Sequence, residues 1–249
     1  MRSWKKISVF ILAIGYSLLA NAQTKDSYDY SSEFTWGINK NTSGGLIGGF
    51  VFKKARKLTD NLLETYGLEI MNVKHPQEVR RYASQSGNPF IYGKSNYLYA
   101  LRTQYGRDII IFKKAPQQGV EIKLVTAIGP TIGIVAPYFI QRANGSGGGI
   151  SDTDTVNEQY DPNNPNDSYD NILGTGNLFE GIGQSKIQLG GNAKVGFNFE
   201  MGTTKNQVTG FEVGFLCDAY FNKIVLMPSS YPIGVFPTLY FTLFYGSRK

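Results

Sequence analysis

The stretch Lys186–Met201, KIQLGGNAKVGFNFEM, alternates between apolar and polar residues over most of its length. A helical period of 3.6 residues would spread both kinds around every side, whereas a β-strand sends successive side chains to opposite faces. The stretch is also long. Strands in soluble proteins usually have about 5–6 residues, and a tilted strand that crosses a bilayer needs roughly 9–11. We therefore predict a strand with one apolar and one polar face, in either a soluble sandwich or a membrane barrel.

Seven further stretches carry a similar alternation, separated by charged, Gly-rich or Pro-rich segments. Together with Lys186–Met201 they predict eight strands joined in sequence. The other seven are Glu33–Lys40, Leu46–Lys53, Leu62–Val73, Tyr97–Tyr105, Val120–Ile134, Gly210–Phe221 and Val235–Gly246.

Several segments between these strands are less regular. Lys54–Asn61 is predicted to be a charged connection, and the apolar run Ile109–Phe112 a strand end that precedes a turn. Pro130 falls on the apolar face of its strand, where the missing N–H predicts a bulge or an edge position. Gln141–Gln184 is predicted to be a long irregular segment, and Thr203–Val208 a tight turn.

The N-terminus has the features of a secretory signal peptide. Basic residues precede the apolar stretch Ile7–Ala20, and Ala20-Asn21-Ala22 supplies small residues at the cleavage positions. We predict cleavage after Ala22, so that residues 1–22 are the signal and residues 23–249 form one β-barrel domain. An uncleaved anchor helix is the alternative. Removing three basic residues lowers the formal charge from +6 to +3, so we expect no nucleic-acid partner.

The fold class predicted is all-β: a single antiparallel up-and-down transmembrane barrel of about eight strands. Aromatic residues make up 14% of the chain and glycines number 29, which suits aromatic girdles and tight packing. The two long segments, Lys74–Ser95 and Gln141–Gln184, both follow odd-numbered strands and would emerge at one end. Cys217, the one cysteine, falls on an apolar strand face. A soluble exported sandwich or lipocalin-like barrel is the alternative.

The polar strand faces carry charges of both signs. In a barrel they point inward and would pair across a plugged lumen, because eight strands leave little room for a channel. These residues are Glu33, Glu69, Arg102, Glu121, Lys123, Lys186, Lys194, Glu200, Glu212 and Asp218. The double glycines Gly48-Gly49 and Gly190-Gly191 lie inside strands, where they predict sheet curvature and close packing.

The aromatic terminal strand, Leu239–Tyr245, and the alternating Gly-rich strands resemble those of small outer-membrane β-barrels of Gram-negative bacteria. Within Leu101–Pro137, the segments QYGR, FKK, PQQG and GPTIG are most similar to the PorT-type outer-membrane barrel group. The resemblance implies an outer-membrane location and a role in type IX secretion or envelope assembly. Fold alone does not fix function.

Three groups of residues are candidates for chemistry. His75, the one histidine, begins a predicted outer loop and could serve a hydrolase or acyltransferase, although a histidine before a proline is more often solvated. The acidic tract Ser151–Asn171 could bind Ca²⁺ weakly, although a solvated loop is the default interpretation. Arg102, Gln104 and Arg107 could hold an anion, but pairing with Glu69, Glu121 or Glu212 is favoured.

We assign no catalytic, cofactor-binding or metal-binding residue and expect no enzymatic activity. The expected function is that of a structural outer-membrane protein or an accessory to secretion or envelope assembly. Expected partners are outer-membrane lipids and envelope or secretion-machinery proteins. A barrel hydrolase or acyltransferase and a small-solute channel remain as alternatives.

Overall fold

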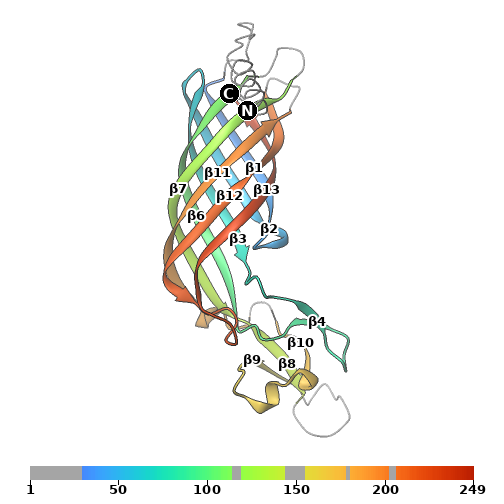
Figure 1. Ribbon diagram of the computed structural model, residues 1–249. Coiled ribbons are helices and arrows are strands. Elements are labelled where there is room, and N and C mark those ends of the chain that lie inside the picture. The colour runs from blue at the N-terminus through green and yellow to red at the C-terminus, as the bar shows by residue number, and fades with distance from the viewer. Residues whose placement is uncertain (1–29, 114–118, 144–154, 178–179, 202–205) are drawn as a thin grey trace, which may run out of the picture.

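The computed structural model describes residues 30–113, 119–143, 155–177, 180–201 and 206–249. The predicted signal peptide and its cleavage site lie outside these ranges. Eight strands close into one antiparallel barrel in the order β1-β13-β12-β11-β7-β6-β3-β2 (Figure 1). The barrel strands are β1 (Ser32–Asn41), β2 (Gly45–Thr59), β3 (Leu62–Val73), β6 (Asn96–Phe112), β7 (Glu121–Pro137), β11 (Lys186–Glu200), β12 (Gln207–Ile224) and β13 (Ile233–Arg248).

The first and last strands close the ring. β1 pairs with β13 from Glu33↔Arg248 to Asn41↔Tyr240. Every strand therefore hydrogen-bonds to a neighbour on both sides, which removes the sheet edges that invite aggregation. The predicted all-β up-and-down barrel of eight strands is confirmed. Its strands have 10 to 18 residues, which is enough to cross a bilayer at a tilt.

The connections at the two ends differ in length. The end where β1 begins and β13 ends, here called the turn end, carries the β2–β3, β6–β7 and β11–β12 connections (Figure 1). The opposite end, the loop end, carries residues 74–95 and the described parts of residues 138–185. The prediction that both long segments emerge at one end is therefore confirmed.

Several predicted boundaries were wrong. β2 continues through Thr59, so residues 54–59 of the predicted charged connection lie in a strand and the turn is Asp60-Asn61. β6 continues through Phe112 and takes up the apolar run Ile109–Phe112. Backbone pairing carries these strands past the point where the alternation weakens, β2 by pairing with β3 and β6 by pairing with β7. Pro130 causes no register shift: Arg102↔Thr131 and Tyr105↔Ile128 keep one register on either side of it.

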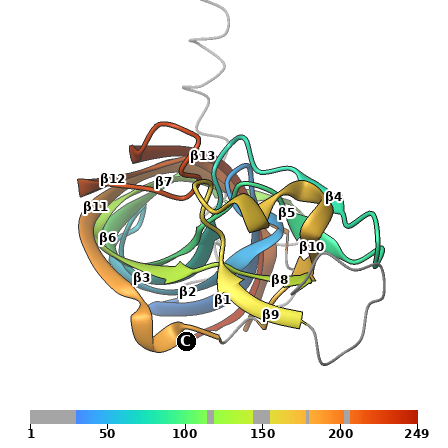
Figure 2. The same ribbon diagram turned by 90° about the horizontal axis from the view of Figure 1, so that it is seen from below.

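Where they are described, the long segments at the loop end are folded, not irregular. Together, the described parts of residues 74–95 and 138–185 form what we call the head. It contains the hairpin β4 (Arg80–Tyr82) and β5 (Pro89–Ile91), the sheet β10 (Ile172–Thr175), β8 (Phe139–Ala143) and β9 (Thr155–Gln159), and the 3-10 turns η2 (Pro165–Asp167), η3 (Tyr169–Asn171) and η4 (Ile182–Gln184). Seen from the loop end, it lies to one side of the ring (Figure 2).

The head has its own apolar core. Phe90, Tyr138, Ile140 and Ile172 are each at most 1% exposed and pack together. Ser95 joins this core to the barrel: its N–H donates to the carbonyl of Leu226, and its hydroxyl donates to that of Tyr160. Among the described residues, no helix has the length and hydropathy to cross a membrane.

Candidate functional site

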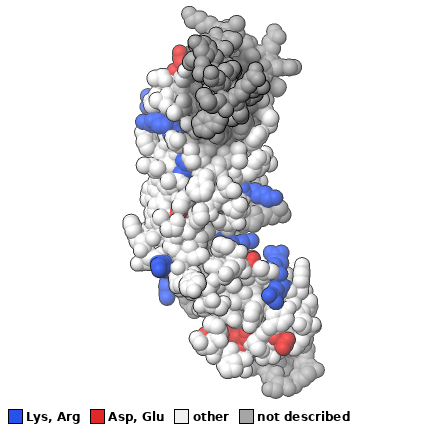
Figure 3. Space-filling model, viewed as in Figure 1, with Lys and Arg blue, Asp and Glu red and all other residues white. Residues whose placement is uncertain are grey.

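The outer wall of the barrel carries an apolar belt that runs round the ring. Alternate residues of every strand point outward, and most of them are large and hydrophobic with roughly 40–60% of their surface exposed. The face shown in Figure 3 has few charges over the barrel wall. Exposed residues of this belt include Phe34, Trp36, Phe50, Phe52, Tyr66, Ile70, Tyr105, Ile109, Ile128, Leu189, Val195, Phe197, Val213, Phe215, Leu239 and Leu243. Cys217 lies on the same outward register, as predicted.

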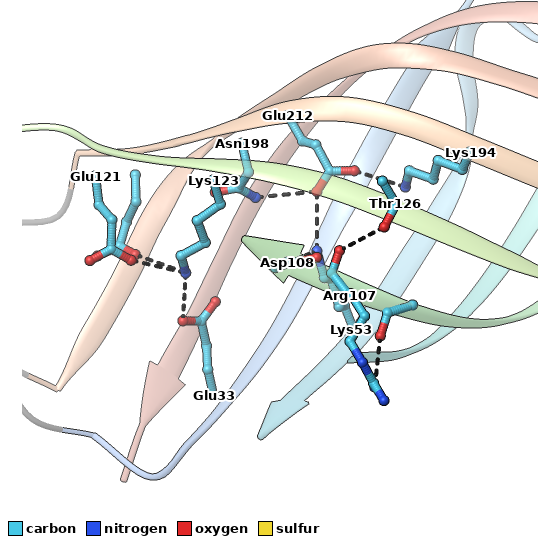
Figure 4. A network of polar contacts seen from close by, with 12 residues as sticks. Glu33, Lys53, Arg107, Asp108, Glu121, Lys123, Thr126, Lys194, Asn198 and Glu212 are labelled. Carbon is cyan, nitrogen blue, oxygen red and sulfur yellow. Dashed lines mark hydrogen bonds and ion pairs between the residues drawn. The ribbon is translucent and has the colours of Figure 1, made fainter. Parts of the chain in front are cut away.

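The lumen near the turn end is filled by ion pairs. The ammonium of Lys123 lies 3.2 Å from carboxylate oxygens of both Glu33 and Glu121, and 3.5 Å from Glu200 (Figure 4). Arg248 bonds Glu33 and Glu200 from β13, and its guanidinium lies 4.1 Å above the ring centre of Tyr30. Four strands, β1, β7, β11 and β13, thereby share one charge network.

A second set of ion pairs fills the middle of the lumen. Lys194 lies 2.8 Å from both Glu69 and Glu212. Lys53 lies 2.6 Å from Asp108 and 3.4 Å from Glu212 (Figure 4). All these side chains are largely removed from solvent, so each needs its partners to offset the cost of burial.

Arg102 is held by two carboxylates. Its Nε and Nη2 donate to the two oxygens of Asp218 at 2.9 and 2.5 Å, and its Nη1 donates to Glu69 at 3.2 Å. The predicted pairing with Glu69 is confirmed. Gln104 instead donates to Asn192 at 3.0 Å. The lumen prediction was wrong for Arg107, which pairs with Glu64 on the outer face because it is an odd number of residues from Arg102.

The lumen near the loop end is closed by apolar side chains. Val51, Met71, Leu98, Tyr220 and Phe236 pack together there. Between them and the ion pairs, a cavity lined partly by Lys53, Gln104 and Lys194 has about 10 Å³, the space of at most one water. The predicted plugged interior is confirmed for the described residues. Lys186 keeps the inward register of its strand but lies exposed at the barrel mouth, where β11 begins, and has no partner in the lumen among the described residues.

The head contains a buried ion pair of its own. The ammonium of Lys94 lies 2.6 Å from Glu78 and 4.6 Å above the ring centre of Tyr97. Lys94 and Glu78 side chains are 1% and 3% exposed. Burial lowers the pKa of Lys94, while the carboxylate of Glu78 opposes that shift. The pair ties the segment that follows β3 to the segment that precedes β6.

The acidic tract is structured where it is described. Arg142 bonds Glu158, and its Nε lies 3.7 Å from Asp167, which is 3% exposed. Asp167 also accepts the N–H of Asp161 at 2.8 Å. Burial raises the pKa of Asp167 to about 6. The default interpretation, a solvated loop, is therefore wrong for Asp167, because an arginine from β8 and local N–H groups replace water around it.

The hypothesis that the acidic tract Ser151–Asn171 binds Ca²⁺ gains no support from the described residues. Asp152 and Asp154 lie outside the described residues, and Asp170 is exposed. In the described part of the chain, no three His, Cys, Asp or Glu side chains are arranged to hold a metal ion.

His75 is buried, not solvated, with 7% of its surface exposed. Its Nδ1 accepts a hydrogen bond from the backbone N–H of Gln77 at 3.2 Å, and its own N–H donates to Glu78. Burial lowers the pKa of His75. These contacts make His75 part of the turn that follows β3. Within the described chain it has no hydrogen bond to an Asp or Ser side chain, as a catalytic base would have.

No protein-family model and no curated protein matches this chain. Among solved structures, Ail, the attachment invasion locus protein of Yersinia pestis, in complex with the heparin analogue sucrose octasulfate, is 10% identical, with a TM-score of 0.41 over 89% of this chain and 99% of that one. Neisserial surface protein A (NspA) is 11% identical, with a TM-score of 0.35 over 88% and 97%. Likeness of this degree is not evidence of a shared function, and the PorT-type resemblance stays a prediction.

Sequence reasoning missed two features of the loop end. The first is the head, whose strands have five residues or fewer and give little periodicity to detect. The second is a cup of about 430 Å³ at the mouth of the barrel, between the head and the start of β11. Its residues come from five separate segments, so no local sequence pattern predicts it.

Proposed function

We propose that this protein spans the outer membrane of a Gram-negative bacterium as a closed barrel and presents its head for contact with another envelope component. The observation that carries the proposal is the apolar outer wall. A water-soluble monomer rarely exposes contiguous apolar surface beyond a few hundred Å², whereas lipid tails cover such a wall without cost.

The inside of the barrel supports the same proposal. A soluble β-barrel or sandwich would fill its interior with apolar side chains and place charges outside. Here, the charged residues Lys123, Lys194 and Arg102 lie inside, and most of the exposed outward-facing side chains are apolar. The closed ring also leaves no backbone group of the wall without a partner strand, which is a requirement for strands in hydrocarbon.

The role that we propose is non-enzymatic: an accessory to secretion or envelope assembly, or a structural protein of the membrane. The exposed hairpin side of the head supports protein contact there. Val79 and Tyr82 are 61% and 65% exposed, and Arg80 and Arg81 lie beside them. Arg and Tyr are residue types enriched in binding hot spots. The exposed Tyr231 lies in the loop between β12 and β13. In the same loop, the hydroxyl of Ser230 donates a hydrogen bond to the side chain of Gln77 in the head.

Two experiments test this proposal. The expressed chain should fractionate with outer membranes and show heat-modifiable mobility on gels; recovery as a soluble periplasmic protein would contradict the membrane proposal. After crosslinking in membranes, wild type should repeatedly recover the same envelope protein. Arg81→Glu should lose it, and Lys249→Glu at the turn end should retain it. Equal recovery with both variants would remove the head from the contact.

A small-solute channel is the first alternative. The ion pairs and the apolar plug leave no continuous path through the described lumen. Planar-bilayer recording should therefore show no stable conductance, and a steady single-channel current would reverse this conclusion.

A hydrolase or acyltransferase using His75 is the second alternative. His75→Ala should leave lipid A modification and outer-membrane proteolysis unchanged. Loss of either activity, with the barrel still heat-modifiable, would favour the enzyme.

A further inference from the structure

The cup at the mouth of the barrel has the size of a small-molecule site. Its volume of about 430 Å³ is within the range of small-molecule pockets, which are found in the mouths of β-barrels among other places. Val135, Ile224 and Val225 give it an apolar side, continuous with the plug that closes the lumen. A ligand could therefore rest on the plug without entering the barrel.

The charge of the cup has one sign. Lys186 and Lys223 line it, and no Asp or Glu does. Neither lysine makes an ion pair within the described part of the chain. The buried lysines of the head and barrel, Lys94, Lys123 and Lys194, are by contrast each paired with a carboxylate. Two unpaired ammonium groups on one concave surface favour an anion.

The remaining polar groups are side-chain amides. Gln159 donates to Ser95 and Asn96, and the carbonyl oxygen of Gln188 accepts from Asn222. These bonds hold the two glutamines in place and leave one amide oxygen (Gln159) and one amide nitrogen (Gln188) without a partner among the described residues. A hydroxyl both donates and accepts, so it can satisfy either group.

We propose that the cup binds a phosphorylated sugar. Lys186 and Lys223 hold the phosphate, the amides of Gln159 and Gln188 bond the hydroxyls, and the apolar side contacts the C–H face of the ring. Such a sugar is either free in solution or the headgroup of a glycolipid whose tails lie against the barrel wall. This inference does not depend on a protein partner for the head.

The test uses the full chain in detergent micelles and isothermal titration with glucose 1-phosphate. Wild type should bind it at least about tenfold more tightly than glucose or inorganic phosphate, since either one alone loses half of the contacts. Equal affinity for inorganic phosphate would overturn the sugar assignment, and no binding of glucose 1-phosphate would overturn the site.

Variants locate the binding. Lys186→Gln with Lys223→Gln should weaken glucose 1-phosphate at least about tenfold. Lys74→Gln, also at the loop end but outside the cup, should change it less than about twofold. An unchanged affinity in the double variant would overturn the proposal. Heat-modifiable mobility checks the fold, and Lys186→Arg with Lys223→Arg, which keeps both charges, should retain binding.

A second arm identifies the source of the sugar. The titration is repeated in nanodiscs made with and without lipopolysaccharide. If the natural ligand is a glycolipid headgroup, lipopolysaccharide should occupy the cup and abolish the binding of glucose 1-phosphate. If the ligand is free, binding should be the same in both nanodiscs. Either result is consistent with a phosphorylated sugar as the ligand and identifies its source.

Discussion

The barrel and the head differ in what fills most of their interior: ion pairs fill most of the barrel lumen, whereas an apolar cluster fills the centre of the head. Within the barrel, charged residues such as Arg102 and Lys123 lie inside, and large apolar residues such as Val195 lie outside. The head follows the usual order: Ile140 and Ile172 are fully buried, while Arg80 and Arg81 are exposed. The inversion occurs where the chain leaves the strands near residues 74 and 138.

This difference indicates a change of solvent along one chain. Apolar surface is expelled from water but not from lipid, so an exposed Val or Phe costs nothing where hydrocarbon covers it. The head needs its own core because water surrounds it. The following predictions test this comparison, from the largest expected effect to the smallest.

Arg102→Met should be the most damaging single change, because it leaves Asp218 and Glu69 without their shared cation in a dry lumen. We expect a loss of about 3–5 kcal/mol in the free energy of unfolding. Urea unfolding in lipid vesicles, followed by the fluorescence of Trp36, measures it. Arg107→Met, on the outer face of the same strand, is the matched control and should cost much less. Equal losses of unfolding free energy in the two variants would show that the buried ion pairs of Arg102 stabilise the barrel no more than the outer pair of Arg107 does.

Val195→Arg tests what covers the outer wall. Val195 is 46% exposed near the middle of β11. In a bilayer, the arginine should cost about 2–4 kcal/mol of unfolding free energy, because its charge would lie in hydrocarbon. Val79→Arg in the head, at a more exposed position, should be nearly neutral. If both variants unfold at the same urea concentration as wild type in vesicles, the wall does not face lipid.

Ile140→Val removes one methylene from the core of the head. We expect a loss of about 1 kcal/mol, which is seen as faster hydrogen exchange of head amides with barrel amides unchanged. Ile134→Val on the outer wall of β7 is the control. Lipid can fill the space there, so exchange should not change. Faster exchange throughout the barrel of Ile140→Val would show that head and barrel unfold as one unit.

The raised pKa of Asp167 predicts that the stability of the head depends slightly on pH. Burial raises its pKa to about 6, so the folded state holds a proton more tightly than the unfolded state does. Its contribution to stability should therefore increase as the pH falls from 7 to 5, by about 1 kcal/mol. Asp167→Asn should remove that increase. Hydrogen exchange of the head at pH 5, 6 and 7, corrected for intrinsic rates, compares the two; parallel profiles would contradict the prediction.

The sequence by itself determined the barrel wall. Two-residue alternation in stretches such as Lys186–Met201 fixes which side chains share a face, because the pleat of a strand is a local property. It also placed the eight strands in order and put the long connections at one end. It did not fix the strand ends, because pairing with neighbours extends β2 and β6 past the point where the alternation fades.

Only the tertiary structure decided which charges meet and what the loops become. Arg102 and Asp218 are 116 residues apart and are brought together by closure of the ring. His75 and Asp167 appeared solvated in sequence but are only 7% and 3% exposed in the folded head. The cup likewise gathers Lys186 and Lys223 from different strands, β11 and β12. A local pattern predicts which side chains share a face of one strand. A site depends on the distances between side chains of different strands, and these are set only when the sheet closes.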